Sequence, residues 1–272
     1  MRQSFANLLA APFVGGALLF LYLSWKDSDR APYIIPFVVV AALIWAFAPQ
    51  INWWWYSRNP PALPAGLRAL LERSSVFYLR LNVAEKKRFR DRTALFMLGT
   101  EWTPMGWPDE AVPPDVQVAL ATQAVSLTFN RPRFLFDKFE KVVVYPLPFP
   151  SPAHDVVHTS ELYQEDGCLL FSAEQLMQAF MQPGTMYNIG LHEYAKAFVL
   201  TYPHETYPDL TTDNIWDNLQ VAGRMSLEHI ESVVGLPIED PLPVAIHHYF
   251  TFPDTFRAVL PEKAATLDKI FH

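Results

Sequence analysis

The chain has 272 residues, of which 51% are hydrophobic and 18% are charged, and its formal net charge is −7. The charge is uneven, because four basic and two acidic residues give +2 over residues 1–60 and leave −9 for residues 61–272. Binding phosphates requires clustered Lys and Arg, so the acidic larger part argues against a nucleic-acid partner. The single cysteine, Cys168, excludes an intramolecular disulfide and a Cys-rich zinc site.

Two long uncharged segments near the N-terminus predict a transmembrane hairpin. Neither residues 3–25 nor residues 31–57 contain Asp, Glu, Lys or Arg, and each run exceeds the roughly 20 residues that cross the hydrocarbon core. We expect helices at about 4–25 and 32–55, within a membrane unit at 1–58 that contacts lipid. A cleaved signal peptide is the alternative for the first run, but a second apolar run follows it instead of a polar mature sequence.

The positions of basic residues predict which side of the membrane the rest of the chain occupies. A hairpin places both of its ends on one side. Four basic residues lie near those ends and two lie in the loop: Arg2, Arg58, Arg68 and Arg73 against Lys26 and Arg30. The positive-inside rule then favours a cytoplasmic location for the following domain, and we expect a bacterial inner membrane to hold the anchor.

After the hairpin, the pattern predicts a linker and a mainly helical domain. Three prolines make residues 59–64 a stiff linker, and the domain is expected at 65–272. A β-branched run stopped by proline and a short apolar run indicate two strands. The expected elements are helices at 65–98, 113–127 and 186–200, strands at 141–149 and 167–172, and mainly helical segments at 211–234 and 240–272. The fold class is therefore α+β with helices dominating.

The stretch NIGLHEYAKAFVL at 188–200 carries the strongest chemical signal. In an HExxH helix, two His at i and i+4 share one face and bind zinc, while the Glu beside the first His takes a proton from the metal-bound water. His192 and Glu193 fit this pattern, but Lys196 stands where the second His belongs. A protonated ammonium has no lone pair and repels a divalent cation. Taken alone, an HE pair on a helix favours a structural His.

Further motifs accompany this helix in a fixed order. They are a small-residue segment at 115–127, YPxxF at 145–149, LLFS at 169–172, NxxLHEYA at 188–195 and AxxxYF at 245–250. Their order and spacing resemble those of the Mlc titration factor A family, the glucose-regulated zinc metallopeptidases, over about residues 67–271. The resemblance implies a mainly helical, zincin-like metallopeptidase domain behind the transmembrane hairpin.

The same resemblance implies roles for individual residues. His192 matches the first zinc ligand and Glu193 the general base, whereas Lys196 falls at the second ligand position. His248 matches the position of a glutamate ligand. If the site is re-wired, a third ligand is expected among His204, Glu205 and His247. Zinc needs at least three protein ligands, so the two altered positions argue against metal binding and against peptidase activity.

Three functions from different classes stay open at this point. The first is a membrane-tethered pseudopeptidase that keeps the fold and its groove and binds a protein or peptide partner. The second is an active zinc-dependent peptidase with re-wired ligands and Glu193 as the general base. The third is a membrane scaffold without peptidase ancestry, in which the HE pair is accidental.

Overall fold

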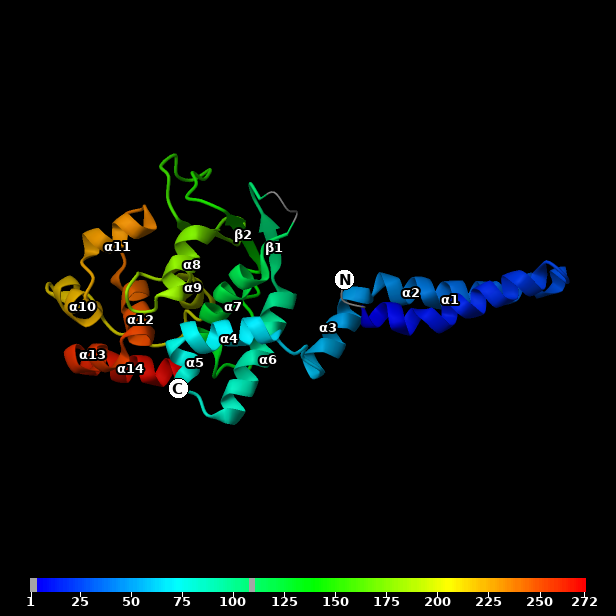
Figure 1. Ribbon diagram of the computed structural model, residues 1–272, viewed down its shortest axis with the longest axis horizontal. Coiled ribbons are helices and arrows are strands. Elements are labelled where there is room, and N and C mark those ends of the chain that lie inside the picture. Colours follow the sequence, from blue (N-terminus) through cyan, green and yellow to red (C-terminus); the bar gives the residue numbers. More distant parts are fainter. Residues whose placement is uncertain (1–3, 108–110) are drawn as a thin grey trace. The chain divides into compact units, whose positions relative to one another are not determined.

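The computed structural model describes residues 4–107 and 111–272 (Figure 1). The chain forms two compact units, Met1–Pro61 and Ala62–His272. The division falls inside the proline-rich segment 59–64, where the backbone has few conformations and no regular structure. Each unit is described by itself.

The first unit consists of two apolar helices that pack along each other, followed by a third. Its elements are α1 (Phe5–Ser24), a 3-10 helix (Ser28–Tyr33), α2 (Ile34–Ala46) and α3 (Ala48–Arg58). The predicted helix 32–55 is therefore divided at Phe47, because Pro49 starts a new helix in the following turn. Two segments, Phe5–Ser24 and Ser28–Ala46, are long and apolar enough to cross a membrane.

The second unit is mostly helical and contains a small mixed sheet. The strands are β1 (Glu101–Pro104), β2 (Lys141–Tyr145), β3 (Ser160–Tyr163) and β4 (Cys168–Ser172), in the order β1-β2-β4-β3. β1, β2 and β4 are parallel, while β3 is antiparallel to β4 and lies at the edge. β2 and β4 correspond to the two predicted strands, and β1 and β3 are short strands that the sequence pattern did not indicate.

The second unit also contains eleven helices, counted over the described residues. They are α4 (Ala65–Ser74), α5 (Val76–Arg80), α6 (Val83–Gly99), α7 (Pro114–Thr128), α8 (Ala173–Met181), α9 (Ile189–Thr201), α10 (Ile215–Gly223), α11 (Leu227–Val234), α12 (Pro241–Thr251), α13 (Pro253–Val259) and α14 (Pro261–Phe271). The predicted helix 65–98 is divided into α4, α5 and α6. A capping box between Asn82 and Glu85 starts α6 anew, which explains the last of these breaks.

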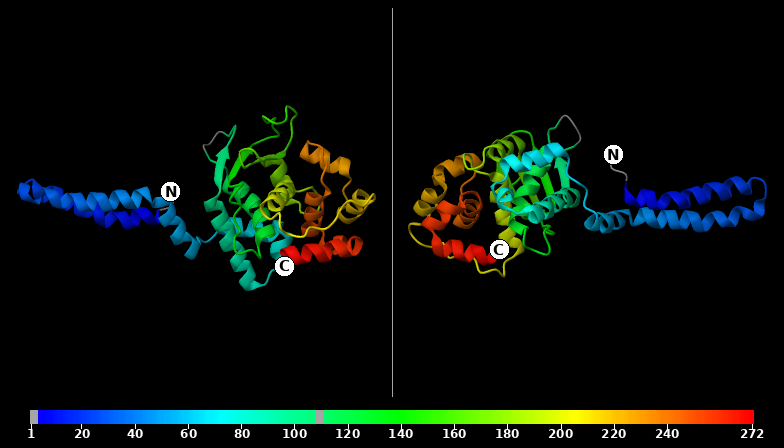
Figure 2. Two further views of the ribbon diagram at one scale, coloured as in Figure 1. Left: turned by 180° about the vertical axis from the view of Figure 1, so that it is seen from behind. Right: turned by 60° about the horizontal axis from the view of Figure 1, so that its bottom comes forward.

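Two helices position the site. α7 is buried along almost its whole length, and α9 packs against α7, α12 and β3. α10 to α14 gather on one side of this unit in all three views (Figures 1 and 2). α9 therefore lies between the buried α7 and the C-terminal helices, with the edge strand of the sheet beside it.

Candidate functional site

The candidate site is built on α9, which carries the HE pair. The side chain of Asn188 accepts a hydrogen bond from the backbone N–H of Leu191 at 3.0 Å and starts the helix. His192 and Glu193 are 3% and 1% exposed, because apolar residues on both sides of them pack against the neighbouring helices. Two ionisable groups on one helix turn are thus held in the interior, where each needs a partner.

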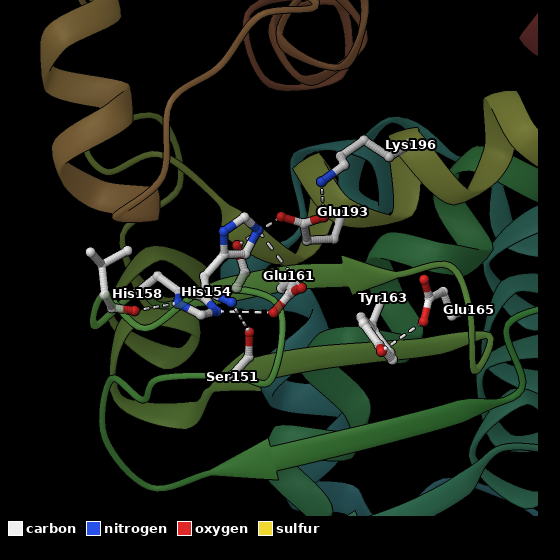
Figure 3. A network of polar contacts seen from close by, with 10 residues as sticks. Ser151, His154, His158, Glu161, Tyr163, Glu165, Glu193 and Lys196 are labelled. Atoms are coloured by element: carbon white, nitrogen blue, oxygen red, sulfur yellow. Dashed lines mark hydrogen bonds and ion pairs between the residues drawn. The ribbon is translucent and has the colours of Figure 1, made fainter.

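Glu193 has two partners, one for each carboxylate oxygen (Figure 3). The Lys196 ammonium lies 2.8 Å from Oε2, and the Ser160 hydroxyl donates to Oε1 at 3.0 Å. The Lys196 contact is close but lacks hydrogen-bond geometry, and it is therefore an ion pair. Burial alone would raise the pKa of Glu193, but the charge of Lys196, the neighbouring His192 ring and the polar contacts bring it below its ordinary value. Glu193 is therefore ionised and engaged at both oxygens.

His192 is held by the hydroxyl of Tyr187, which lies 2.6 Å from its Nδ1. Tyr187 is fully buried, and burial holds its pKa well above the ordinary value, so the phenol keeps its proton. That proton needs an acceptor, which makes Tyr187 the donor and Nδ1 the acceptor. Burial also lowers the pKa of His192 to about 4, so the neutral ring carries its single proton on Nε2.

His247 and His248 form a second buried pair on α12. The backbone N–H of Asn188 donates to Nε2 of His247 at 3.0 Å, and the two Nδ1 atoms lie 3.1 Å apart. Burial lowers the pKa of His248 to about 3 and that of His247 well below its ordinary value, so both rings are neutral. The proton of His247 is then on Nδ1 and is donated to Nδ1 of His248. Because Nδ1 of His248 accepts this hydrogen bond, the neutral His248 ring carries its proton on Nε2.

The Nε2 of His248 has no hydrogen-bond partner within the described part of the chain. The ring lies directly against Gly223 at the end of α10, where a Cβ atom would collide with it. The ring of Tyr187 stacks on His247, with 4.1 Å between centroids, and meets His248 edge-on. Tyr187 thus contacts the three buried histidines of α9 and α12, although the sequence pattern gave no signal for it.

The remaining candidate ligands lie past the end of α9. Glu205 forms an ion pair with Arg131 at 2.6 Å, and His204 is exposed. Neither side chain lines the pocket that contains His192 and Glu193. The structure therefore groups His192, Glu193 and Lys196 on one helix and His247 and His248 on another, and leaves His204 and Glu205 apart from them.

A pocket of about 470 Å³ opens beside α9. His192, Glu193 and Lys196 line it together with residues from β3 and from the segment before α12. Glu161 and His154 also line it, although the sequence shows no motif around His154. Sequence reasoning missed Glu161 and His154 because it did not predict β3. A β-bridge between Phe149 and His158 folds the loop before β3 back onto the edge of the sheet, which places both side chains beside the pocket.

A comparison with protein families decides the ancestry. The model of the glucose-regulated metallo-peptidase M90 family matches residues 51–200, more than half of the chain. The chain belongs to the M90 family. This is the family that the motifs resemble, and the match contains α9 with His192, Glu193 and Lys196, whereas α12 lies beyond it. A comparison with curated proteins found no match.

The M90 family is a metallopeptidase family, so the expected ligands were tested for their fit to a zinc ion. Within residues 4–107 and 111–272, no group of three or more His, Cys, Asp or Glu side chains is placed to hold a metal ion. Lys196 offers no free lone pair because its ammonium is paired with Glu193, and Nε2 of His248 faces Gly223. In this arrangement the side chains at the motif do not fit a zinc ion.

Proposed function

We propose that the protein is a membrane-anchored pseudopeptidase of the M90 family that binds a protein or peptide partner in the pocket beside α9. The observation that carries the proposal is the 2.8 Å contact between Lys196 Nζ and Glu193 Oε2. Lys196 supplies a fixed positive charge next to the carboxylate, so this charge is compensated without a metal ion. The buried turn of α9 then contains no uncompensated carboxylate charge in a metal-free protein.

The state of Glu193 argues against a catalytic role. A general base must approach the proton that it accepts, with a pKa near the working pH. Glu193 instead has a lowered pKa, and its two oxygens contact Lys196 and Ser160. An ion-paired carboxylate of this kind is a weak base, which supports binding rather than hydrolysis as the function of the pocket.

The two other functions receive less support. An active, re-wired site needs a third ligand near His192 and His248, but Glu205 is paired with Arg131, His204 is exposed, and both ring nitrogens of His247 have partners. Family membership argues against a scaffold without peptidase ancestry. A zincin-like fold is part of the proposal, supported by the buried motif helix beside a sheet with an antiparallel edge strand.

The membrane anchor is part of the same proposal. α1 and α2 are apolar and pack mainly on each other, while most of their large side chains are exposed, as expected for helices that contact lipid. Asn52 of α3 accepts hydrogen bonds from the Ser4 hydroxyl at 3.0 Å and the Ala6 N–H at 2.9 Å, which close the open end of the hairpin. We place the domain in the cytoplasm of a bacterium on the distribution of basic residues.

The proposal is tested with the full-length chain in a mild detergent. A pool of random heptapeptides is offered, and both peptide enrichment and cleavage are measured. We expect enrichment without cleavage, and loss of enrichment in Leu200→Trp, which fills the pocket, but not in Leu147→Trp, an exposed leucine outside it. Cleavage that Glu193→Gln abolishes would establish an active peptidase instead, and enrichment that Leu200→Trp leaves unchanged would exclude this pocket.

A further inference from the structure

The pocket beside α9 has an excess of carboxylates. Four acidic side chains line it, from β3, from α9 and from the segment before α12: Glu161, Glu193, Glu239 and Asp240. Lys196 is the one Lys or Arg in this lining, counted over the described residues, and its ammonium contacts Glu193. None of the other three carboxylates has a Lys or Arg partner, although Glu161 contacts His158 and Asp240 accepts a hydrogen bond from the backbone N–H of Leu242.

Glu161 is the most buried of these three, at 5% exposure. Its Oε2 lies 3.2 Å from Nε2 of His158, a ring whose Nδ1 donates to the carbonyl oxygen of Val156 at 2.9 Å (Figure 3). Its Oε1 lies 3.9 Å from Nε2 of His154, which is too far for a hydrogen bond. Because Nδ1 already donates to the Val156 carbonyl, the contact with Glu161 needs a further proton, shared between Nε2 of His158 and Oε2 of Glu161. His158 thus fixes the orientation of the carboxylate and occupies Oε2, while Oε1 stays available to a ligand.

Beyond His154, Gln164 and His192, the rest of the lining is apolar. It includes Leu162, Val199, Leu200, Leu236 and Ile238. Lys and Arg side chains combine a long apolar stem with a charged head, and they place the stem along apolar surface while the head reaches a polar group. A pocket with aliphatic walls and carboxylates at separate points matches this chemistry better than it matches an acidic or a purely apolar side chain.

We propose that this pocket binds a Lys or Arg side chain of the peptide partner. Its stem packs on the aliphatic walls, and its head donates to Oε1 of Glu161, while Glu239 and Asp240 on the opposite segment add attraction. The acidic charge of residues 61–272 favours the approach of a basic peptide. The inference rests on the proposed function, since it names the chemistry of the partner that the same pocket binds.

The test compares four labelled heptapeptides of alanine that differ only at the central residue: Lys, Arg, norleucine or Glu. Norleucine keeps an aliphatic stem and lacks the charge. Binding to the full-length protein in detergent is measured by fluorescence anisotropy. We expect Lys and Arg peptides to bind about tenfold more tightly than the norleucine peptide, the effect of one charge-assisted hydrogen bond, and the Glu peptide to bind most weakly.

Single substitutions test which carboxylates cause the preference for Lys and Arg peptides. Glu161→Gln should abolish it. Glu239→Gln, at an exposed position that tolerates change, should reduce it, while Glu262→Gln, an exposed glutamate on α14 outside the pocket, should leave it intact. Equal binding of all four peptides, blocked by Leu200→Trp, would refute the basic preference and leave the binding function standing. Absence of binding by every peptide would refute both.

Discussion

Replacing Lys196 with methionine tests the role of the ion pair on α9. The substitution keeps the length and apolar stem of the side chain and removes its charge. Glu193 then lies 1% exposed without a cation, and Ser160 provides its remaining polar contact. Removing one partner of a fully buried pair costs about 3–5 kcal/mol, and an exposed pair is worth about 0–1 kcal/mol. Because the Lys196 side chain is 35% exposed, we expect a loss of about 2 kcal/mol.

The loss of stability in Lys196→Met should be larger at high pH than at low pH. In the wild type the pKa of Glu193 is lowered, so its contribution is complete above the ordinary glutamate pKa and disappears as pH falls through the folded-state value. In Lys196→Met, burial remains without the compensating charge and raises the folded-state pKa. As the pH falls, Glu193 of the variant is protonated, and the free-energy cost of its buried charge disappears. The difference between the two proteins should therefore be largest near about pH 8 and shrink toward about pH 4.

Hydrogen exchange of α9 peptides in the full-length protein reports the local free energy of opening. Lys87→Met is the matched control, since Lys87 pairs with Asp91 at 2.7 Å on the exposed face of α6 and should cost about 0.3–0.5 kcal/mol. Glu193→Gln combined with Lys196→Met should recover part of the loss, because no buried charge is left. If α9 in Lys196→Met exchanges as in the wild type, Lys196 does not compensate Glu193 and the reasoning is wrong.

Three further substitutions test other parts of the structure. Tyr187→Phe should remove the donor to Nδ1 of His192 at a cost of about 1–3 kcal/mol; an unchanged ¹⁵N spectrum of His192 would contradict the assigned tautomer. Gly223→Ala should destabilise by about 1–3 kcal/mol, because the new methyl group collides with His248, whereas a gain in thermal stability, as helix propensity alone predicts, would show that the ring moves away. Ser28→Cys should react with a membrane-impermeant maleimide in intact cells; labelling restricted to broken cells would place the loop in the cytoplasm.

The sequence predicted the parts of the site that depend on local helix geometry. Residues four apart share a helix face, so Lys196 was expected beside His192; its ion pair with Glu193, three residues earlier, is a contact that the motif did not predict. The strand at 141–145 was visible because β-branched residues precede a proline. Family ancestry was also readable, because motifs separated by many residues occur in one order, and the M90 match confirms it.

The features that decide the chemistry come from long-range packing. β3 has only four residues, too few for a recognisable alternation, so its pairing with β4 and the position of Glu161 could not be predicted. The contact between Tyr187 and His192 joins a loop to a helix, and Gly223 meets His248 across two helices. Neither contact follows from a regular spacing of residues in the sequence. The predicted roles as zinc ligands stay predictions, and the geometry of the site makes zinc binding less favourable. They concern His192, His204, Glu205, His247 and His248.

The central claim is that the motif on α9 no longer binds zinc. The most direct measurement is the zinc content of the full-length protein after incubation with zinc and removal of excess metal, with His192→Ala analysed in parallel. We predict zinc far below one ion per chain, with no difference between the two proteins. About one zinc ion per chain in the wild type, lost in His192→Ala, would contradict the account and establish a re-wired metal site.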